Sequence, residues 1–128
     1  MPAQIKKRPK YLDLSKIRLP IPALVSILHR VSGAILFLGF IPLLLLALAA
    51  SLASPESFAS LQAKFSHPLS KILMLGFAWA YLHHFCAGIR HLLMDMHKGI
   101  DLQSSRLSAK MVMGVSIVLT LLIGIKLW

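Results

Sequence analysis

A run of 25 residues without Asp, Glu, Lys or Arg, from Val31 to Pro55, constrains how this chain folds more than any other feature. A helix needs about 20 apolar residues to cross a hydrocarbon core about 30 Å thick, so this run can span a membrane. Two more apolar stretches follow, Ile72 to Ile89 and Leu107 to Leu127. The pattern predicts an all-α membrane protein with three transmembrane helices, at about 22–52, 68–97 and 107–127, in a single membrane-anchor domain covering 1–128.

The composition excludes several other classes of protein. Hydrophobic residues make up 57% of the chain and charged residues 14%, with a formal charge of +10. A water-soluble domain of this size carries about 25% charged residues. The basic residues lie at the ends of the apolar runs, which favours a membrane over nucleic acid as their partner. With Cys86 as its one cysteine, the chain has no disulfide framework and no cysteine motif for a metal or a covalently attached haem.

The distribution of basic residues predicts the orientation of the chain. They are concentrated in a basic segment, residues 1–21, and again after the second span, and few charges follow the first. The positive-inside rule therefore predicts a cytoplasmic N-terminus and a C-terminus on the outside. No Arg- and Ser-rich presequence is recognisable, which favours the inner (cytoplasmic) membrane of a bacterium.

Two prolines and two polar stretches predict the boundaries of the spans. Proline fits the first turn of a helix, so Pro20 and Pro22 set the start of the first span. Pro42 is expected to bend that helix midway. The segments at about 53–67 and 98–106 are expected to be short polar connections.

Ionisable side chains inside the second span are costly and commonly mark function. At about 100° per residue, His84, Gly88, His91 and Asp95 form one narrow stripe, and His83 and Arg90 fall on another face. His84 lies about 20 Å from the predicted helix end. A buried histidine of this kind either forms a hydrogen bond between helices or binds a metal.

The stripe suits a haem that stands on edge. Neutral imidazole is a common axial ligand of haem iron, and Gly88 leaves room for a flat macrocycle. The haem carboxylates would then meet His91 and Arg30. His83 points away from His84, and His29 and His91 are expected about 10.5 Å nearer the membrane surface. A second axial ligand is therefore expected from another polypeptide.

On the first helix, Ser26, Arg30 and Gly33 share a stripe at the depth of the membrane interface. A hydroxyl and a guanidinium can together hold a carbonyl oxygen of an amphiphilic ligand, and the positive charge favours a reduced, anionic form of it. The alternative is that Arg30 anchors the helix to lipid phosphates beside a capping serine.

Two strings of residues resemble a known family. Ser26–Gly33 (SILHRVSG) and His84–Asp95 (HFCAGIRHLLMD) are similar to the cytochrome b membrane-anchor subunits of succinate dehydrogenase, respiratory complex II. The start, Arg8–Leu14, and Ser108–Lys110 before the third span fit as well. The likeness covers nearly the whole chain.

The resemblance implies a role for each matching residue. His84 corresponds to an axial ligand of a b-type haem, whose other ligand is a histidine of a second, smaller anchor subunit. Ser26 and Arg30 correspond to residues that contact quinone, and His29, Arg30 and His91 to contacts of the haem propionates. His83, next to the ligand, departs from the family pattern.

The family passes electrons from succinate to quinone through a flavoprotein and iron–sulfur clusters. This chain has no GxGxxG motif and too few cysteines for clusters, so FAD and iron–sulfur clusters are expected on partner subunits. The chain is not expected to be catalytic alone. Two alternatives remain at this point: a structural anchor without haem, and a small subunit of a transporter or channel.

Overall fold

The computed structural model describes residue 13 and residues 15–128. Most of the predicted basic segment, including Arg8 and the start of the family resemblance, lies outside the described residues. The elements in chain order are α1 (Ile21–Ile35), the π-helical turn η1 (Leu36–Phe40), α2 (Ile41–Ala53), α3 (Pro55–Ser66), α4 (Pro68–Asp95) and α5 (Leu102–Leu127). All regular elements in this part of the chain are helical.

Three helical stretches are long and apolar enough to cross a membrane, which confirms the predicted number of spans. They cover Ile21–Ala53 with 33 residues, Pro68–Asp95 with 28 and Leu102–Leu127 with 26. Most of their large apolar side chains are exposed on the surface of the chain. Such a surface is suited to lipid or to a partner within the membrane.

The first span is one long rod with an irregularity where the sequence predicts a bend. It begins at Ile21, with Pro22 in its first turn. The N–H of Ile41 donates to the carbonyl of Leu36, five residues earlier, and Pro42 follows directly. Proline has no N–H and its ring crowds the carbonyl four residues before it, so a wider π turn at this point removes the conflict.

The connection between the first two spans was expected to be a short polar linker, and it is a helix, α3. The Oγ atom of Ser54 accepts a hydrogen bond from the N–H of Ser57 at 3.1 Å, and Pro55 occupies the first turn. A capping serine followed by proline is a typical helix start.

Between α2, α3 and α4 lies an apolar cavity of about 530 Å³ whose lining includes Phe40, Phe65 and Phe77.

The helix α4 ends two residues before the predicted boundary at His97. The N–H groups of His97 and Lys98 donate to the carbonyls of Met94 and Leu93, and His97 has a φ of 60°. This is the Schellman arrangement, in which the residue with positive φ is usually glycine. The helix therefore stops at a backbone motif with a histidine in the left-handed position.

The helix α5 begins at Leu102, five residues before the predicted start of the third span. Its cap is Asp101, whose carboxylate accepts a hydrogen bond from the N–H of Ser104 at 2.9 Å. Hydrogen bonds from Ser104 hold the pKa of Asp101 below its usual range. The first turns of α5 are polar, so the apolar pattern alone places its start too late.

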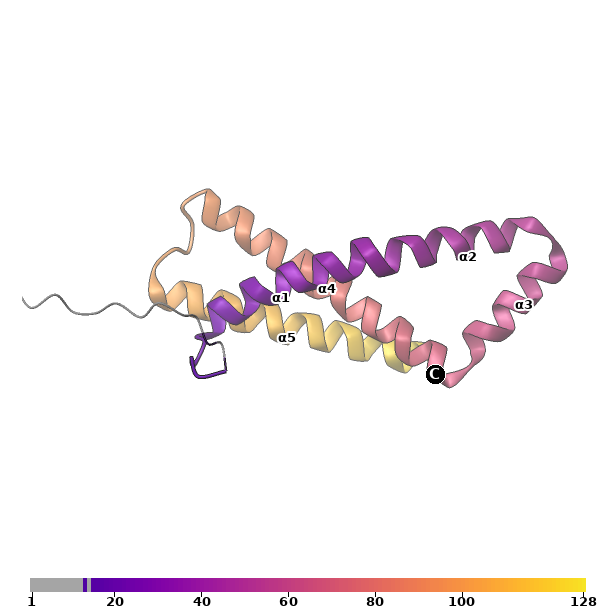
Figure 1. The fold of residues 1–128 in the computed structure, drawn as a ribbon. Helices are drawn as coiled ribbons and strands as arrows, with labels where there is room; N and C mark the ends of the chain where they lie inside the picture. The colour runs from indigo at the N-terminus through magenta and orange to yellow at the C-terminus, as the bar shows by residue number, and fades with distance from the viewer. Residues whose placement is uncertain (1–12, 14) are drawn as a thin grey trace, which may run out of the picture.

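The three spans pack together where α4 crosses α1, near the middle of α4 (Figure 1). There α4 contacts both α1 and α5, and within the described chain α2 contacts only η1 and α3. The buried apolar residues are small, as is usual where membrane helices cross closely. They are Val25, Ala80, Ala87, Ala109 and Val112.

A buried cation joins α4 to α5. Arg90, which is 5% exposed, donates from Nε to the hydroxyl of Ser108 at 3.0 Å. From Nη2 it donates to the hydroxyl of Ser105 at 3.0 Å and to the carbonyl of Ser105 at 3.3 Å. These bonds from Arg90 of α4 to two serines of α5 fix the rotation of α4 against α5.

Candidate functional site

His84 of α4 is held by the backbone of α1. Its Nδ1 atom lies 2.9 Å from the carbonyl oxygen of His29. A carbonyl oxygen can only accept a hydrogen bond, so Nδ1 carries the proton. In a neutral ring Nε2 then has a free lone pair, which is the form in which imidazole binds a metal.

Two small residues of α1, Ser32 and Gly33, lie against the His84 ring. The hydroxyl of Ser32 donates to the same His29 carbonyl at 3.0 Å and lies 3.3 Å from Nδ1 of His84. A Cβ atom on Gly33 would stand 2.8 Å from Cε1 of His84 and 3.2 Å from Nδ1. Contacts this short are not tolerated, so the ring can lie against α1 only because residue 33 has no side chain.

The Nε2 atom of His84 reaches the surface of the chain. It has no hydrogen-bond partner among the described residues. Within that part of the chain, the buried side-chain nitrogen and oxygen atoms that lack a partner belong to His83. The lone pair of His84 is therefore accessible to a ligand from outside.

His83 is placed quite differently from its neighbour. It is 0% exposed, and its ring stacks on Trp79 at a centroid distance of 5.1 Å. His83 and Arg90 are both buried, as expected for residues that share a face away from the His84 stripe. A ring enclosed in this way cannot present a nitrogen to an external ligand.

The ring of His29 lies nearer to that of His84 than the helical spacing predicts. The two rings stack at a centroid distance of 4.2 Å and an angle of 8°, and the ring centroid of His91 lies 5.0 Å from that of His29. Stacked rings face each other, whereas two ligands of one iron must point at it from opposite sides. His29 is thus not arranged to bind the same iron from the side opposite His84. Its ring nevertheless lies at nearly the depth of the His84 ring, and not about 10.5 Å nearer the membrane surface as predicted. A Cβ on Gly88 would lie 3.6 Å from Nε2 of His29, so in this structure Gly88 faces that ring.

Ser26 and Arg30 lie one turn apart on α1, Ser26 half-buried and Arg30 exposed. Neither side chain has a hydrogen-bond partner in the part of the chain that the structure describes. Ser26 lies about 8 Å and Arg30 about 14 Å from the start of the helix. The hydroxyl and the guanidinium are thus available to a polar group at a shallow depth in the membrane.

The described side chains could provide an axial ligand for a haem, but they do not form a site that holds a metal ion with protein ligands alone. Over residues 13 and 15–128, His, Cys, Asp and Glu side chains form no group of three that could hold a metal ion. A haem supplies four nitrogen ligands itself and takes one or two axial ligands from protein side chains. The imidazole of His84, with Nδ1 bound to the His29 carbonyl and no partner for Nε2 among the described residues, could provide one such ligand.

The roles of Ser32 and Gly33 toward His84 were not predicted from the sequence. Gly33 was noted only as part of the stripe with Ser26 and Arg30. No local pattern shows which residue of one helix will be touched by a side chain as far away in the sequence as His84 is from Ser32, 52 positions. The sequence gives a weak indication of the partners of Arg90. Ser105 and Ser108 are three residues apart and therefore lie on one face of α5.

Comparisons with known proteins agree with this arrangement. The profile of the family described as "Succinate dehydrogenase/Fumarate reductase transmembrane subunit" matches residues 4–123. The chain belongs to this family. The "Succinate dehydrogenase cytochrome b556 subunit" of Coxiella burnetii is 40% identical over 126 residues, covering 95% of this chain and 98% of that protein.

More distant relatives of this anchor subunit carry related descriptions. The cytochrome b556 subunit of Paracoccus denitrificans is 33% identical over 115 residues, which cover 90% of this chain and 88% of that protein. The mitochondrial cytochrome b560 subunit of Dictyostelium discoideum is 29% identical over 116 residues, 88% of this chain and 59% of its own length. The chain is thus a multi-pass membrane-anchor subunit of succinate dehydrogenase in respiratory complex II.

Proposed function

We propose that this anchor subunit binds haem b through Nε2 of His84 and forms part of the quinone site of succinate:quinone oxidoreductase. The observation that carries the proposal is the 2.9 Å contact of Nδ1 with the His29 carbonyl, which leaves Nε2 as an accessible lone pair. The names of the cytochrome b556 relatives support the same cofactor. The enclosed position of His83 supports the choice of His84 over its neighbour.

The residues of this chain orient the ligand rather than react. The His29 carbonyl and the Ser32 hydroxyl fix the tautomer and plane of the His84 ring, and Gly33 lets it approach α1. When bound, a b-type haem supplies a one-electron carrier close to the quinone. His29, Arg30 and His91 would neutralise its propionates, a role supported by the stacking of His29 on His84 and by the closeness of His91 to His29.

Ser26 and Arg30 would hold the head group of the quinone substrate. A guanidinium and a hydroxyl can both donate to a carbonyl oxygen of the quinone, and the positive charge favours its anionic reduced form. Their shallow depth supports a site at the membrane interface that a hydrophilic electron donor can reach. The rest of the site would come from the iron–sulfur subunit and the second anchor.

The remaining components lie on partner subunits. A second, smaller anchor subunit would supply the other axial histidine, and the iron–sulfur clusters and FAD belong to the two hydrophilic subunits. The charge pattern supports a cytoplasmic N-terminus and an outside C-terminus in a bacterial inner membrane. Electrons would pass from the iron–sulfur subunit to quinone at the cytoplasmic side.

Spectra of the assembled complex with single substitutions test the proposal. We expect His84→Ala to abolish the sharp reduced-state bands of low-spin haem b and His83→Leu to preserve them. The amount of assembled complex, measured by the flavin content of the purified membrane fraction, serves as the control. Normal low-spin bands in His84→Ala would contradict the assignment, and an absence of haem in the wild type would favour a purely structural anchor.

A further inference from the structure

Arg90 presents an electrostatic problem that its hydrogen bonds only partly solve. It is 5% exposed and lies in a membrane span, and its three bonds go to neutral oxygen atoms of Ser105 and Ser108. In the described part of the chain the one ion pair is that of Lys16 with Asp13. A buried charge without a counter-charge is unfavourable. An anion from outside the chain would therefore stabilise the Arg90 guanidinium.

The guanidinium has a nitrogen left for such an anion. Nε and Nη2 make the hydrogen bonds to α5, and Nη1 has no partner among the described residues. The buried nitrogen and oxygen atoms without partners in that part of the chain are those of His83. Nη1 is therefore not sealed inside the protein, and its N–H groups reach open space.

That space is a cavity of about 400 Å³ between the end of α4 and the start of α5. Its lining combines the cations of Arg90 and Lys98 with Ser104, Ser108 and a set of apolar side chains, and includes no carboxylate. The nearby carboxylate of Asp101 is occupied as the cap of α5. The apolar part of the lining is made by Ile89, Leu93, Met94, Met111 and Val112.

The depth of the cavity suits the head group of a lipid. Arg90 lies five residues before Asp95, so its Cα is about 8 Å from the end of α4. Ile89, Leu93 and Met111 are exposed along the helices that line the cavity. A phosphate beside Arg90 and Lys98 would thus continue into an acyl chain lying on these side chains.

We propose that this cavity binds the phosphate group of an anionic glycerophospholipid, which supplies the counter-charge of Arg90. Arg90 would donate to the phosphate from Nη1, and Lys98 would add a second positive charge. Basic pockets between membrane helices are known to suit such head groups. The site is separate from the proposed haem and quinone residues and does not depend on them.

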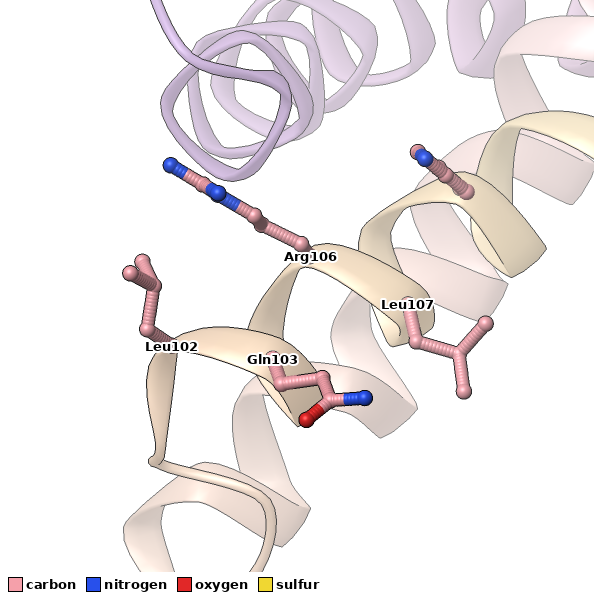
Figure 2. A pocket seen from close by; sticks show the side chains of 5 residues that line it. Leu102, Gln103, Arg106 and Leu107 are labelled. Atoms are coloured by element: carbon pink, nitrogen blue, oxygen red, sulfur yellow. The ribbon is translucent and has the colours of Figure 1, made fainter.

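A second cavity at the start of α5 provides a comparison. It has a volume of about 430 Å³ and is lined by Leu102, Gln103, Arg106, Leu107 and Lys110. Figure 2 shows Arg106 extending from α5 toward the N-terminal part of the chain. Arg106 and Lys110 are both exposed and can be solvated without a ligand. Lys110 therefore serves as a control for Lys98, because it is also an exposed lysine but lines the other cavity.

The experiment measures lipid binding to the assembled, delipidated complex by native mass spectrometry. Phosphatidylglycerol and phosphatidylcholine with identical acyl chains are titrated against wild type, Lys98→Gln, Met111→Trp and Lys110→Gln. Because Arg90 also joins α4 to α5, the decisive variants are Lys98→Gln and Met111→Trp, which leave that contact in place. Inorganic phosphate is added in a separate series.

We expect wild type to retain one phosphatidylglycerol that inorganic phosphate does not displace. Lys98→Gln should bind it about fivefold more weakly, since one lysine is lost near an anionic lipid. Met111→Trp, which fills the acyl-chain path, should weaken binding at least as much, and Lys110→Gln should bind like wild type. Equal binding in Lys98→Gln and Lys110→Gln would overturn the proposal, as would displacement by inorganic phosphate or equal retention of phosphatidylcholine.

Discussion

Gly33 of α1 lies so close to His84 of α4 that a methyl group on residue 33 would stand 2.8 Å from Cε1 of the imidazole. The same movement that relieved this contact would take Nδ1 away from the His29 carbonyl, 2.9 Å distant. One glycine thus controls both the position and the hydrogen bond of the side chain proposed to bind iron. Its effect is therefore expected on the properties of the haem and not only on folding.

Gly33→Ala should change the spectrum and raise the midpoint potential of the haem. Loss of the bond to Nδ1 makes the imidazole a weaker electron donor, and a neutral hydrogen bond is worth about 1 kcal/mol. For a one-electron couple 59 mV corresponds to 1.4 kcal/mol, so a rise of about 40 mV is expected in redox titrations. Gly76→Ala is the control, because a Cβ there meets no atom within 4 Å. An unchanged potential in Gly33→Ala would show that the position of the His84 ring against α1 does not affect the midpoint potential of the haem.

His83→Leu should leave the assembled complex as stable as wild type or make it more stable. Both ring nitrogens of His83 are buried and lack a hydrogen bond of good geometry among the described residues, so the desolvation of the ring is poorly compensated. Leucine has a similar volume and no polar atoms. Thermal unfolding of the complex measures the effect, with His83→Lys as a variant that should be strongly destabilised. A large loss of stability in His83→Leu would mean that the ring makes a polar contact within the complex.

The sequence predicted the features that depend on local spacing. Apolar runs of sufficient length predicted the three spans, and the helical period separated the face of His84 from that of His83 and Arg90. The structure confirms both. Pro42, which was predicted to bend the first span, follows the π-helical turn η1, because the missing N–H of proline has a local effect.

The features that were missed depend on contacts between segments far apart or on polar helix ends. The approach of His84 to Gly33 follows from how α1 and α4 cross, which no single helix reveals. The depth of His29 was misjudged for the same reason. The start of α5 at the Asp101 cap and the helix α3 were hidden because their first turns are polar, and an apolar pattern detects only the buried or lipid-facing part of a helix.

The isolated chain should bind little low-spin haem. His84 is the only histidine of the described spans that both points a free nitrogen outward and is fixed by a backbone bond, and the ring of His29 stacks on it rather than opposing it. Expression of this chain without its partners is therefore expected to give no stable spectrum with two histidine ligands. Coexpression with the second anchor should restore it. A monomeric chain with such a spectrum would refute the need for a partner histidine.

His97→Gly should raise the thermal stability of the complex slightly. His97 has a φ of 60°, at the position of the Schellman motif where glycine has no steric cost. A residue with a Cβ costs about 1 kcal/mol in this conformation, and glycine recovers part of it. Lys98→Gly, next in the chain, is the control and should bring no gain. A lower unfolding temperature for His97→Gly would indicate that its side chain makes a contact in the complex.

Replacing Arg30 should impair quinone reduction more than replacing Ser26. Hydrogen bonds from a charged group are worth about 1.5 to 3 kcal/mol and neutral ones about 0.5 to 1.5 kcal/mol. Since 1.4 kcal/mol is a factor of ten, Arg30→Leu should reduce kcat/KM for quinone about tenfold or more, and Ser26→Ala by less. Succinate oxidation with an artificial acceptor that takes electrons before the quinone should be normal in both variants. If the Arg30→Leu complex reduces quinone like wild type, the quinone site lies elsewhere, and the exposed guanidinium is better explained as a partner of haem propionates or lipid phosphates.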